Sequence, residues 1–186
     1  MNIFYLHESP EECAKLHCDK HVVKMVIEYA QLMCTAHRML DGEEYVALSQ
    51  NGRKVKRWRL AQNDDLIYKA CHMNHPSTVW TRSSRDNYMY VYNLWYYLSH
   101  EYTYRYGKVH MTYQKLSDVL SAPPQRIPNT GFTQPPPAMK QFSQCIVKGD
   151  SIASYQKYYT VAKARFARWT KREVPDFMIS SYAEKF

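Results

Sequence analysis

The feature that most constrains the fold of this chain is a long apolar segment between residues 19 and 40. Its apolar side chains recur at steps of three and four residues and cover most of the circumference of the expected helix. Asp19 is the expected N-cap, and Asp41-Gly42 is the expected end. Such a helix must be surrounded by other elements, so it predicts the centre of a mainly α protein. Its polar residues form one narrow stripe, which we expect to border a cleft: Lys20, Lys24, Glu28, Gln31, Thr35 and Arg38.

Other segments predict further helices around the central one and a single β-hairpin. Ser9, as N-cap with Glu12 in a capping box, begins a short helix that ends near residue 18. Asn51-Gly52 predicts a two-residue turn in a hairpin at about residues 45–60. The remaining expected elements are a strand over 2–6, a short helix capped by Ser77, and helices over 64–73, 84–106, 109–121 and 150–171.

The chain shows no internal linker. Six prolines between residues 122 and 139 predict an extended loop rather than a boundary between two domains. We therefore expect one domain over residues 1–186, a helical bundle that carries a small β-hairpin.

Composition favours a polyanionic partner. The 186 residues hold 25 Lys and Arg against 17 Asp and Glu, a formal net charge of +8, which favours nucleic acid. Glycine occurs five times and tyrosine 17 times, and both common glycine-rich phosphate loops are missing. The sequence has neither an apolar run of membrane-spanning length nor a signal peptide, so we expect a cytoplasmic protein without a membrane partner. Five cysteines fit a reducing compartment.

Basic residues are concentrated in two segments, the hairpin and the last predicted helix. Basic side chains that alternate with aromatic rings are typical of nucleic-acid-binding surfaces. Either segment alone is commonly a solvated face, but the two together predict DNA binding. The expected DNA contacts are Arg53, Lys54, Lys56, Arg57 and Arg59 in the hairpin, with Arg82, Lys157, Lys163, Arg165 and Arg168 elsewhere.

The residues expected to carry chemistry begin at the N-terminus of the central helix. Two lysines there face the positive end of the helix dipole, which favours anion binding and lowers the pKa of an amine. The alternative is that Asp19 only caps the helix and that the lysines are solvated. Further candidates lie beside the Pro76 turn and at the end of the aromatic helix. The candidate catalytic residues are Asp19, Lys20, His21, Lys24, Glu28, His75, Glu101, Arg105 and His110.

The spacing of histidine and cysteine residues does not indicate zinc. Cys34 and His37 have helical spacing, but Cys13, Cys18 and Cys34 match no zinc-finger or ribbon pattern. Cys-x-x-Cys does not occur in the chain. We therefore expect neither a metal nor a cofactor.

Several blocks, spread over nearly the full length, carry a resemblance to a family of small proteins from tailed phages. They are Cys18-Asp19-Lys20-His21-Val22-Val23-Lys24-Met25, His75-Pro76 with Trp80, Glu101-Tyr102-Thr103-x-Arg105-Tyr106-Gly107-Lys108-x-His110, Pro135-Pro136-Pro137 and Asp150-Ser151-x-x-x-Tyr155-x-x-Tyr158-Tyr159. Members of this family are commonly labelled pyrimidine dimer DNA glycosylases. They are also similar to the helical, DNA-glycosylase-like families of phage thymine hypermodification, in which an amine displaces pyrophosphate on the base.

The resemblance implies a DNA-glycosylase-like helical fold and an enzyme that acts on a pyrimidine base of DNA in the host cytoplasm, with the base flipped out of the duplex. In a glycosylase reaction, Asp19 or Glu101 would activate water and Lys20 would form a Schiff base. In a transferase reaction, Lys20, Lys24 and Arg105 would bind pyrophosphate, while Glu101 or His75 would deprotonate the amine. Two other functions stay open: a non-catalytic DNA-binding or host-interaction protein, and an enzyme on a free nucleotide.

The charged groups lead to one geometric expectation. A carboxylate is disfavoured at the C-terminal end of a helix, so Glu101 should have a cationic partner beyond Arg105. We expect this partner to be Lys20 or Lys24. Together with His75, these residues are predicted to line one cleft that opens on the same side as the basic hairpin.

Overall fold

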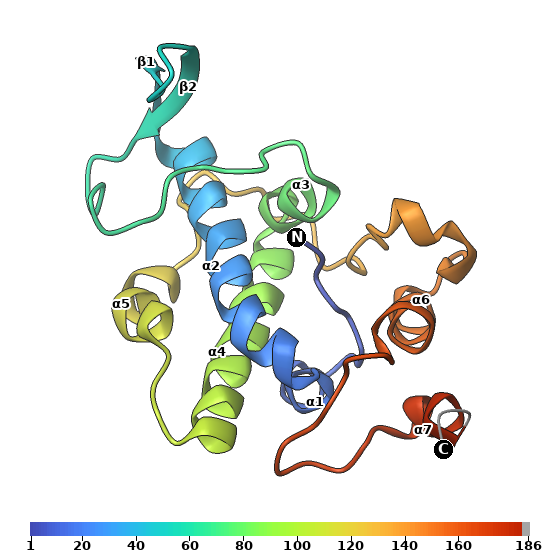
Figure 1. Ribbon diagram of the computed structural model, residues 1–186. Coiled ribbons are helices and arrows are strands. Elements are labelled where there is room, and N and C mark those ends of the chain that lie inside the picture. The colour runs from blue at the N-terminus through green and yellow to red at the C-terminus, as the bar shows by residue number, and fades with distance from the viewer. Residues whose placement is uncertain (184–186) are drawn as a thin grey trace.

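The computed structural model describes the backbone of residues 1–183 and the side chains of residues 1–179. The chain is mainly helical, with one two-stranded antiparallel sheet (Figure 1). Its helices are α1 (Pro10–Leu16), α2 (Asp19–Asp41), α3 (Pro76–Ser83), α4 (Arg85–Tyr106), α5 (Met111–Leu120), α6 (Ser151–Tyr158) and α7 (Asp176–Ala183). The other elements are β1 (Glu43–Leu48), β2 (Lys54–Arg59), the 3-10 helix η1 (Lys140–Cys145) and the π-helix η2 (Tyr159–Lys163). Within residues 1–183 we find no helix that meets the length and apolarity needed to cross a membrane.

Helix α2 lies at the centre of the structure, as its apolar pattern predicts, and packs against α4. The indole of Trp95 on α4 is fully buried and donates a hydrogen bond to the carbonyl oxygen of Val26 on α2 (2.8 Å). The hydroxyl of Tyr88 donates to the carbonyl oxygen of Leu120 at the end of α5 (3.0 Å). Tyrosines on α4 therefore contribute apolar volume to the core and also satisfy backbone groups of neighbouring helices.

Most helix boundaries follow the local signals. The Ser9 hydroxyl accepts a hydrogen bond from the amide of Glu12, which confirms it as the cap of α1. Glu12 does not complete the capping box, because its carboxylate pairs with Lys15. Gly107 ends α4 with φ of 71°, as expected of a glycine in this position. The predicted cap of α2 is wrong by one residue, since Cys18 is the N-cap and Asp19 begins the helix.

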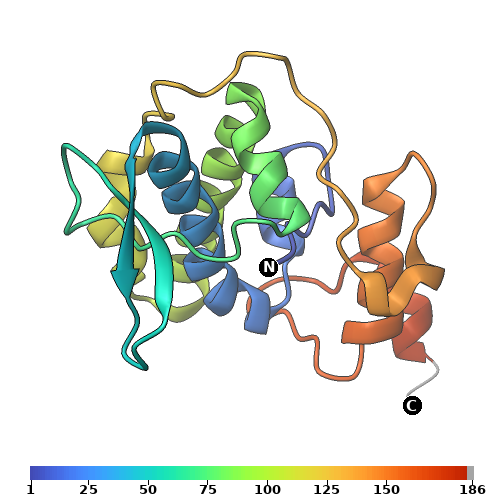
Figure 2. The ribbon, with the colours of Figure 1, turned by 90° about the horizontal axis from the view of Figure 1, so that it is seen from above.

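The predicted hairpin is confirmed, but its turn is longer than expected. β1 and β2 pair in register from Glu43 opposite Arg59 to Leu48 opposite Lys54. The amide of Ser49 donates to the carbonyl oxygen of Arg53, which leaves three residues in the loop, and Gly52 has φ of 72°. Figures 1 and 2 show the hairpin projecting from the helical body, with α6 and α7 on the opposite side of the molecule.

The helix expected over residues 64–73 does not form. The guanidinium of Arg38, buried on α2, donates to the backbone carbonyl oxygens of Asp64, Ile67 and Tyr68 at 2.6 to 2.7 Å. These are carbonyls that a helix over the same residues would use for its own hydrogen bonds. Arg38 therefore holds the segment in an irregular path. The strand expected over residues 2–6 is also absent from the structure.

The C-terminal third departs most from expectation. Residues 121–139 contain no helix or strand, as the prolines predict. The expected helix from 150 to 171 ends at residue 163, after α6 has passed into the π-helix η2. An irregular segment then leads to α7, which the sequence pattern did not predict.

Candidate functional site

The predicted carboxylate–arginine pair on α4 forms a buried ion network. The guanidinium of Arg105 donates to the carboxylates of Glu101 (2.7 Å) and Asp19 (2.9 Å), and its side chain is completely buried. It also donates to the carbonyl oxygens of Lys15 and His17, each at 2.9 Å. One arginine therefore joins α4 to the end of α1 and the start of α2.

A second arginine completes this network. Arg172 donates to both carboxylate oxygens of Glu101, at 2.9 and 2.8 Å. The predicted pairing of Glu101 with Lys20 or Lys24 is therefore wrong, and the cationic partner comes from the irregular segment after η2. Burial raises the pKa of Glu101, but the hydrogen bonds from Arg172 and Arg105 outweigh burial, so the pKa lies below its usual value.

Asp19 is committed to the same network. Besides Arg105, its carboxylate accepts hydrogen bonds from the amide and the hydroxyl of Thr170, the latter at 2.8 Å. A carboxylate that accepts this many hydrogen bonds fixes the position of the backbone around it. Asp19 and Glu101 therefore fasten residues 170–172 to the start of α2.

Two of the candidate histidines are helix N-caps. The Nδ1 atom of His75 accepts a hydrogen bond from the amide of Ser77 at the start of α3, and Nδ1 of His110 accepts from the amide of Thr112 at the start of α5. Burial lowers the pKa of both imidazoles, with a further contribution at His75 from the N-terminal amine. The neutral ring is the form in which Nδ1 accepts a hydrogen bond.

His21 lies in the interior beside the N-terminus of α2. Its ring stacks on Phe4, with centroids 4.1 Å apart, and its Nδ1 contacts the hydroxyl of Tyr159 on η2. Burial lowers the pKa of His21 to about 2, and the charges of His17, Lys163 and Lys24 act in the same direction. His21 is therefore a neutral hydrogen-bonding group that ties α2 to η2.

The exposed face of α2 carries a cationic surface with aromatic rings beneath it. The ammonium group of Lys20 lies 4.6 Å from the ring centroid of Phe166, and that of Lys163 lies 4.5 Å from Tyr158 and 6.0 Å from Phe166. Lys24 is 68% exposed one turn along the helix. We call Lys20, Lys24, Lys163, Tyr158 and Phe166 the lysine surface.

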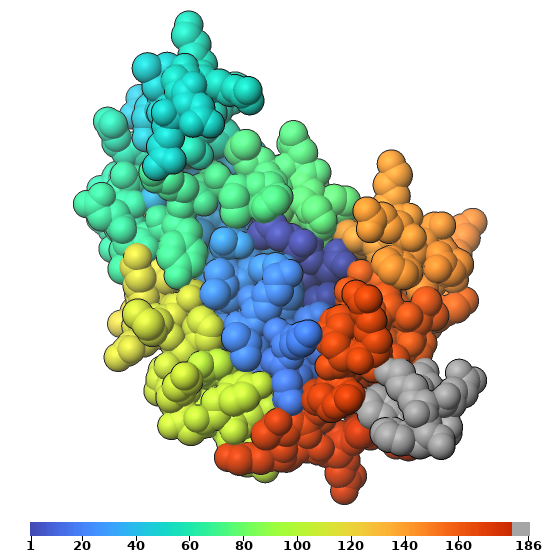
Figure 3. Space-filling model, viewed as in Figure 1, coloured from blue at the N-terminus to red at the C-terminus, as the bar shows by residue number. Residues whose placement is uncertain are grey.

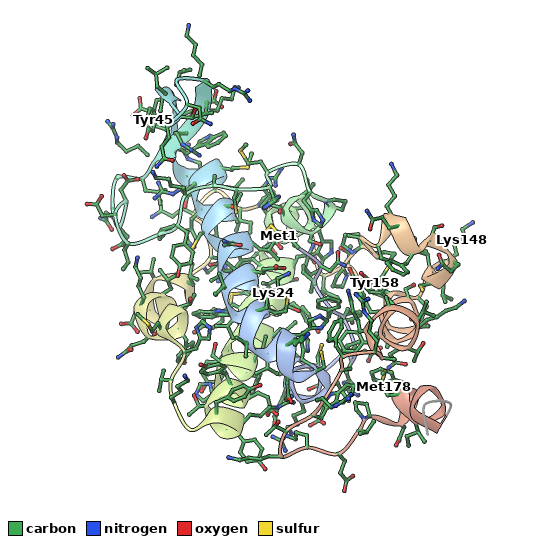
Figure 4. The ribbon with its side chains drawn as sticks, in the orientation of Figure 1. Met1, Lys24, Tyr45, Lys148, Tyr158 and Met178 are labelled. Atoms are coloured by element: carbon green, nitrogen blue, oxygen red, sulfur yellow. The ribbon has the colours of Figure 1, made fainter. Side chains whose placement is uncertain are left out.

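The π-helix shapes this surface. π-helical turns inside α-helices are uncommon and frequently occur at functional sites. In this chain the wide turn directs Tyr159 toward His21 and places Lys163 over the rings of Tyr158 and Phe166. Figure 4 labels Lys24 on the central helix α2 and Tyr158 at the end of α6.

Glu28 is the carboxylate of this face. Its side chain is 15% exposed and bonds the ammonium of Lys24 at 2.9 Å, with the amine of Met1 at 3.8 Å on its other oxygen. His75 is close enough for the charges of Glu28 and the amine to act on its pKa. The residues predicted to line one cleft thus divide, with Glu101 and Arg105 in the ion network and Lys24 beside Glu28.

The expected DNA contacts of the hairpin are mostly exposed. Lys56 bonds Glu44 across the strands (2.8 Å), and the guanidinium of Arg59 lies 5.0 Å from the ring centroid of Tyr45. The outer positions of β1 are also exposed, including Val46 and Leu48 at 62% and 71%. Trp58 is the buried position of β2, and the other positions of the ribbon are exposed or half-buried, so its cationic side chains lie mostly at the surface.

The remaining expected DNA contacts do not lie on the one long helix that the sequence predicts, but on several elements. Arg82 is half-buried and donates to the carbonyl oxygen of Met73 (2.8 Å), so part of its hydrogen-bonding capacity serves the fold. Lys157 is exposed on α6, and Lys163 ends η2. Arg165 and Arg168 are exposed in the irregular segment that follows, and Arg168 donates to the carbonyl oxygen of Ala167.

Sequence reasoning missed two contributors to these sites. The sequence pattern gives Arg172 only as a basic residue at the end of the last predicted helix, but Arg172 bonds Glu101. The pattern assigns no role to Phe4, whose ring stacks on His21. Both act through contacts with residues more than 15 positions away, for which a local pattern gives no signal. Among the described residues, no three His, Cys, Asp or Glu side chains gather as metal ligands would.

Comparisons with protein-family models, with curated proteins and with solved structures give no match to this chain.

Proposed function

We propose that the protein is a DNA-directed enzyme with a DNA-glycosylase-like fold that acts on a pyrimidine base. The observation that carries this proposal is the lysine surface, where Lys20 and Lys163 extend over aromatic rings and Lys24 bonds the carboxylate of Glu28. Cations, ring faces and a carboxylate are the groups that a flipped nucleotide requires: phosphate contacts, a stacking partner and a proton acceptor.

The hairpin supplies the electrostatic part of this function. It carries Arg53, Lys54, Lys56, Arg57 and Arg59 on an exposed ribbon. Figure 3 shows the hairpin and the exposed side of α2 on one face of the molecule, so one DNA duplex is able to meet both. Each phosphate contact releases counterions and makes the affinity depend on salt.

The aromatic residues of the lysine surface support a role in holding a base. Phe166 is half-buried beneath two ammonium groups and is the ring open to a base, whereas Tyr158 is buried, with ring centroids 6.3 Å from Phe4 and 5.2 Å from Phe142. Stacking of a base on an aromatic side chain contributes about 1–3 kcal/mol. An extruded pyrimidine would gain this stacking while its phosphates meet the lysines.

Glu28 is the carboxylate assigned to the chemical step, because its partner Lys24 belongs to the lysine surface, whereas Asp19 and Glu101 are committed to the Arg105 network. In a glycosylase reaction the bond between C1′ and the base nitrogen breaks, and the base leaves with the electron pair. Water adds its oxygen to C1′ and gives a proton to the Glu28 carboxylate. The ammonium of Lys24 lies 2.9 Å from one oxygen of Glu28 and fixes the position of that carboxylate.

The first test is DNA binding. Replacing Lys20, Lys24 and Lys163 with glutamine is expected to weaken binding of a labelled duplex and to lower the log–log salt slope by about 0.9 for each phosphate that the protein no longer neutralises. Neutralising the five hairpin residues should lower the slope further. The matched control replaces three exposed lysines elsewhere, Lys108, Lys140 and Lys148, and should leave the slope nearly unchanged. Equal slopes for all variants would show that neither the lysine surface nor the hairpin neutralises DNA phosphates, and would overturn the proposal.

The second test is base release. Plain, UV-irradiated and 5-hydroxymethyluracil-containing duplexes are incubated with the protein, and free base is measured by chromatography. Glu28→Gln should reduce release about 100-fold or more while DNA binding persists, because general acid–base groups contribute factors of that size. Glu173→Gln, at an exposed carboxylate elsewhere, is the control. DNA binding without any change to the DNA would favour the non-catalytic binding function instead.

A transferase reaction is the second candidate, favoured by the three cations of the lysine surface, one of which pairs with the Glu28 carboxylate. An amine would form a bond to the exocyclic methylene carbon of a modified thymine, and pyrophosphate would leave with the electron pair. The lysines would neutralise the pyrophosphate, and Glu28 would accept the proton of the amine. Release of inorganic pyrophosphate from a pyrophosphorylated 5-hydroxymethyluracil duplex, dependent on added amine and without free base, would assign this reaction.

A further inference from the structure

A second candidate site lies away from the lysine surface, in a cavity of about 510 Å³. Its lining residues are Tyr5, Glu8, Tyr90, Phe132, Thr133 and Gln134. Tyr5 follows Phe4 in the N-terminal segment, but the two rings have different neighbours. Phe4 contacts His21 and Tyr158, whereas Tyr5 contacts Tyr90 and Phe132. The cavity therefore belongs to another part of the molecule than the proposed DNA site.

Three aromatic rings form one wall of this cavity. The ring centroid of Tyr90 lies 5.3 Å from that of Tyr5 and 5.4 Å from that of Phe132, and Tyr5 and Phe132 are 6.4 Å apart. Phe132 remains 44% exposed, so part of its face is open to a ligand. The faces of aromatic rings carry negative potential and attract cations within about 6 Å of the centroid.

The segment that carries Phe132 is fixed on both sides. The amide of Thr133 donates to the side-chain oxygen of Asn87 (3.0 Å), and its hydroxyl accepts from the indole of Trp80 (2.9 Å). On the other side, the carbonyl oxygen of Pro128 accepts from the amide of Arg85 (2.7 Å). The ring wall is therefore present before any ligand binds, which lowers the entropy cost of binding.

The polar groups of the cavity favour a positive ligand. Glu8 is exposed at its edge and forms no ion pair with another residue of the described part of the chain. Tyr5 is 3% exposed, and its hydroxyl forms no hydrogen bond among residues 1–179, so the oxygen is left to solvent at the cavity. Burial raises the pKa of that hydroxyl, and the charges of Glu8 and Asp150 raise it further. The local potential is negative, although the chain as a whole is strongly basic.

We propose that this cavity binds a small organic cation of the alkylammonium class. The head group would lie against Phe132 and Tyr90, with Glu8 neutralising its charge and the Tyr5 hydroxyl facing it. A neutral apolar molecule would meet the same rings but would leave the carboxylate without a partner. The Glu8 carboxylate therefore favours a cationic ligand over a neutral apolar one.

The experiment compares choline with its neutral isostere 3,3-dimethylbutan-1-ol, using the full chain. NMR titration follows the indole N–H of Trp80, which bonds Thr133 and whose ring lies 6.1 Å from Phe132. Choline should shift this signal and bind about three- to 30-fold more tightly than the isostere. Equal affinity for the two molecules, or no movement of the Trp80 signal, would overturn the proposal.

Two variants locate the preference. Glu8→Gln should remove most of the preference for choline, whereas Glu43→Gln, at an exposed carboxylate on the hairpin, should keep it. Phe132→Leu should weaken choline binding without changing the unfolding midpoint, because the side chain is nearly half exposed. A preference for choline that survives both Glu8→Gln and Phe132→Leu would place the cation elsewhere and overturn the assignment. DNA binding is independent of this result.

Discussion

Two glutamate–cation pairs with the same helical spacing have opposite surroundings. Glu101 and Arg105 on α4 are 4% and 0% exposed, whereas Glu28 and Lys24 on α2 are 15% and 68% exposed. Arg105 also bonds Asp19 and two carbonyl oxygens, but Lys24 has only Glu28 as an ion-pair partner among the described residues. The first pair stabilises the fold, and the second leaves a cation available for a ligand. Spacing along a helix does not distinguish these roles; the contacts from other elements do.

The strongest way to break this comparison is to remove each cation separately. Arg105→Met should lower the free energy of unfolding by about 3–5 kcal/mol, because it leaves buried carboxylate and carbonyl groups without their donor. Lys24→Met should change it by less than about 1 kcal/mol, as expected of an exposed pair. Urea unfolding of the two variants measures both values. A similar loss in both would show that the two pairs contribute equally to stability.

Acid should lower the free energy of unfolding through a buried histidine beside the Arg105 network. His17 bonds the carbonyl oxygen of Cys13 (2.7 Å) and the hydroxyl of Tyr29 (2.8 Å), and burial lowers its pKa to about 4. The unfolded chain binds the proton near its ordinary pKa of about 6.5, so stability falls as the pH drops below that value. This single histidine should cost roughly 3 kcal/mol between pH 6.5 and pH 4.

Urea unfolding at several pH values measures this loss, and NMR follows the imidazole of His17 directly. The control variant His100→Gln, at an exposed imidazole, should retain the wild-type dependence on pH. A His17 ring that takes up its proton near pH 6.5 in the folded protein would contradict the prediction.

The smallest expected effect concerns His75, on the side of Lys24 and Glu28. If the ring acts as the cap of α3, His75→Asn should keep the stability within a few tenths of a kcal/mol, because asparagine is an effective cap, while His75→Ala should cost about 1 kcal/mol. Thermal unfolding compares the two. Base release by the asparagine variant then separates a capping role from a catalytic one. Release stays at the wild-type level if the ring only caps α3 and falls if the ring takes part in the reaction.

The elements that local signals predict are those whose causes are local. α2 follows from its apolar periodicity, the end of α4 from Gly107, and the hairpin from Asn51-Gly52 between two strands. Each depends on residues that are neighbours in the sequence, so the pattern contains most of the information.

The failures arise where a distant side chain decides the backbone. Residues 64–73 have helical spacing, but Arg38 takes three of their carbonyl oxygens and the helix is lost. The C-terminal helix ends at 163, and Trp169 and Thr170 instead bond Leu16 and Asp19. These contacts join parts of the chain that no local window contains.

The candidate site divides in the same way. The periodicity of α2 predicts one polar stripe, in which Lys20 and Lys24 are exposed and Glu28 is half-buried. Thr35 and Arg38, in the same stripe, are buried by the segment that they bond. Histidine is an unusual helix cap, so the capping roles of His75 and His110 had no sequence signal.

The ion network around Arg105 also sets the order in which the chain can reach its final state. It joins residues 15–19 to residue 105 and to residues 170–172, so some of its hydrogen bonds close loops of 90 and 151 residues. Helices form within about a microsecond, but contacts this far apart must first overcome loop-closure entropy. On the ribosome, α2 is synthesised long before its anchoring partners and has to wait with Asp19 still hydrated. Native docking of its first turn is therefore completed only when residue 172 has left the exit tunnel.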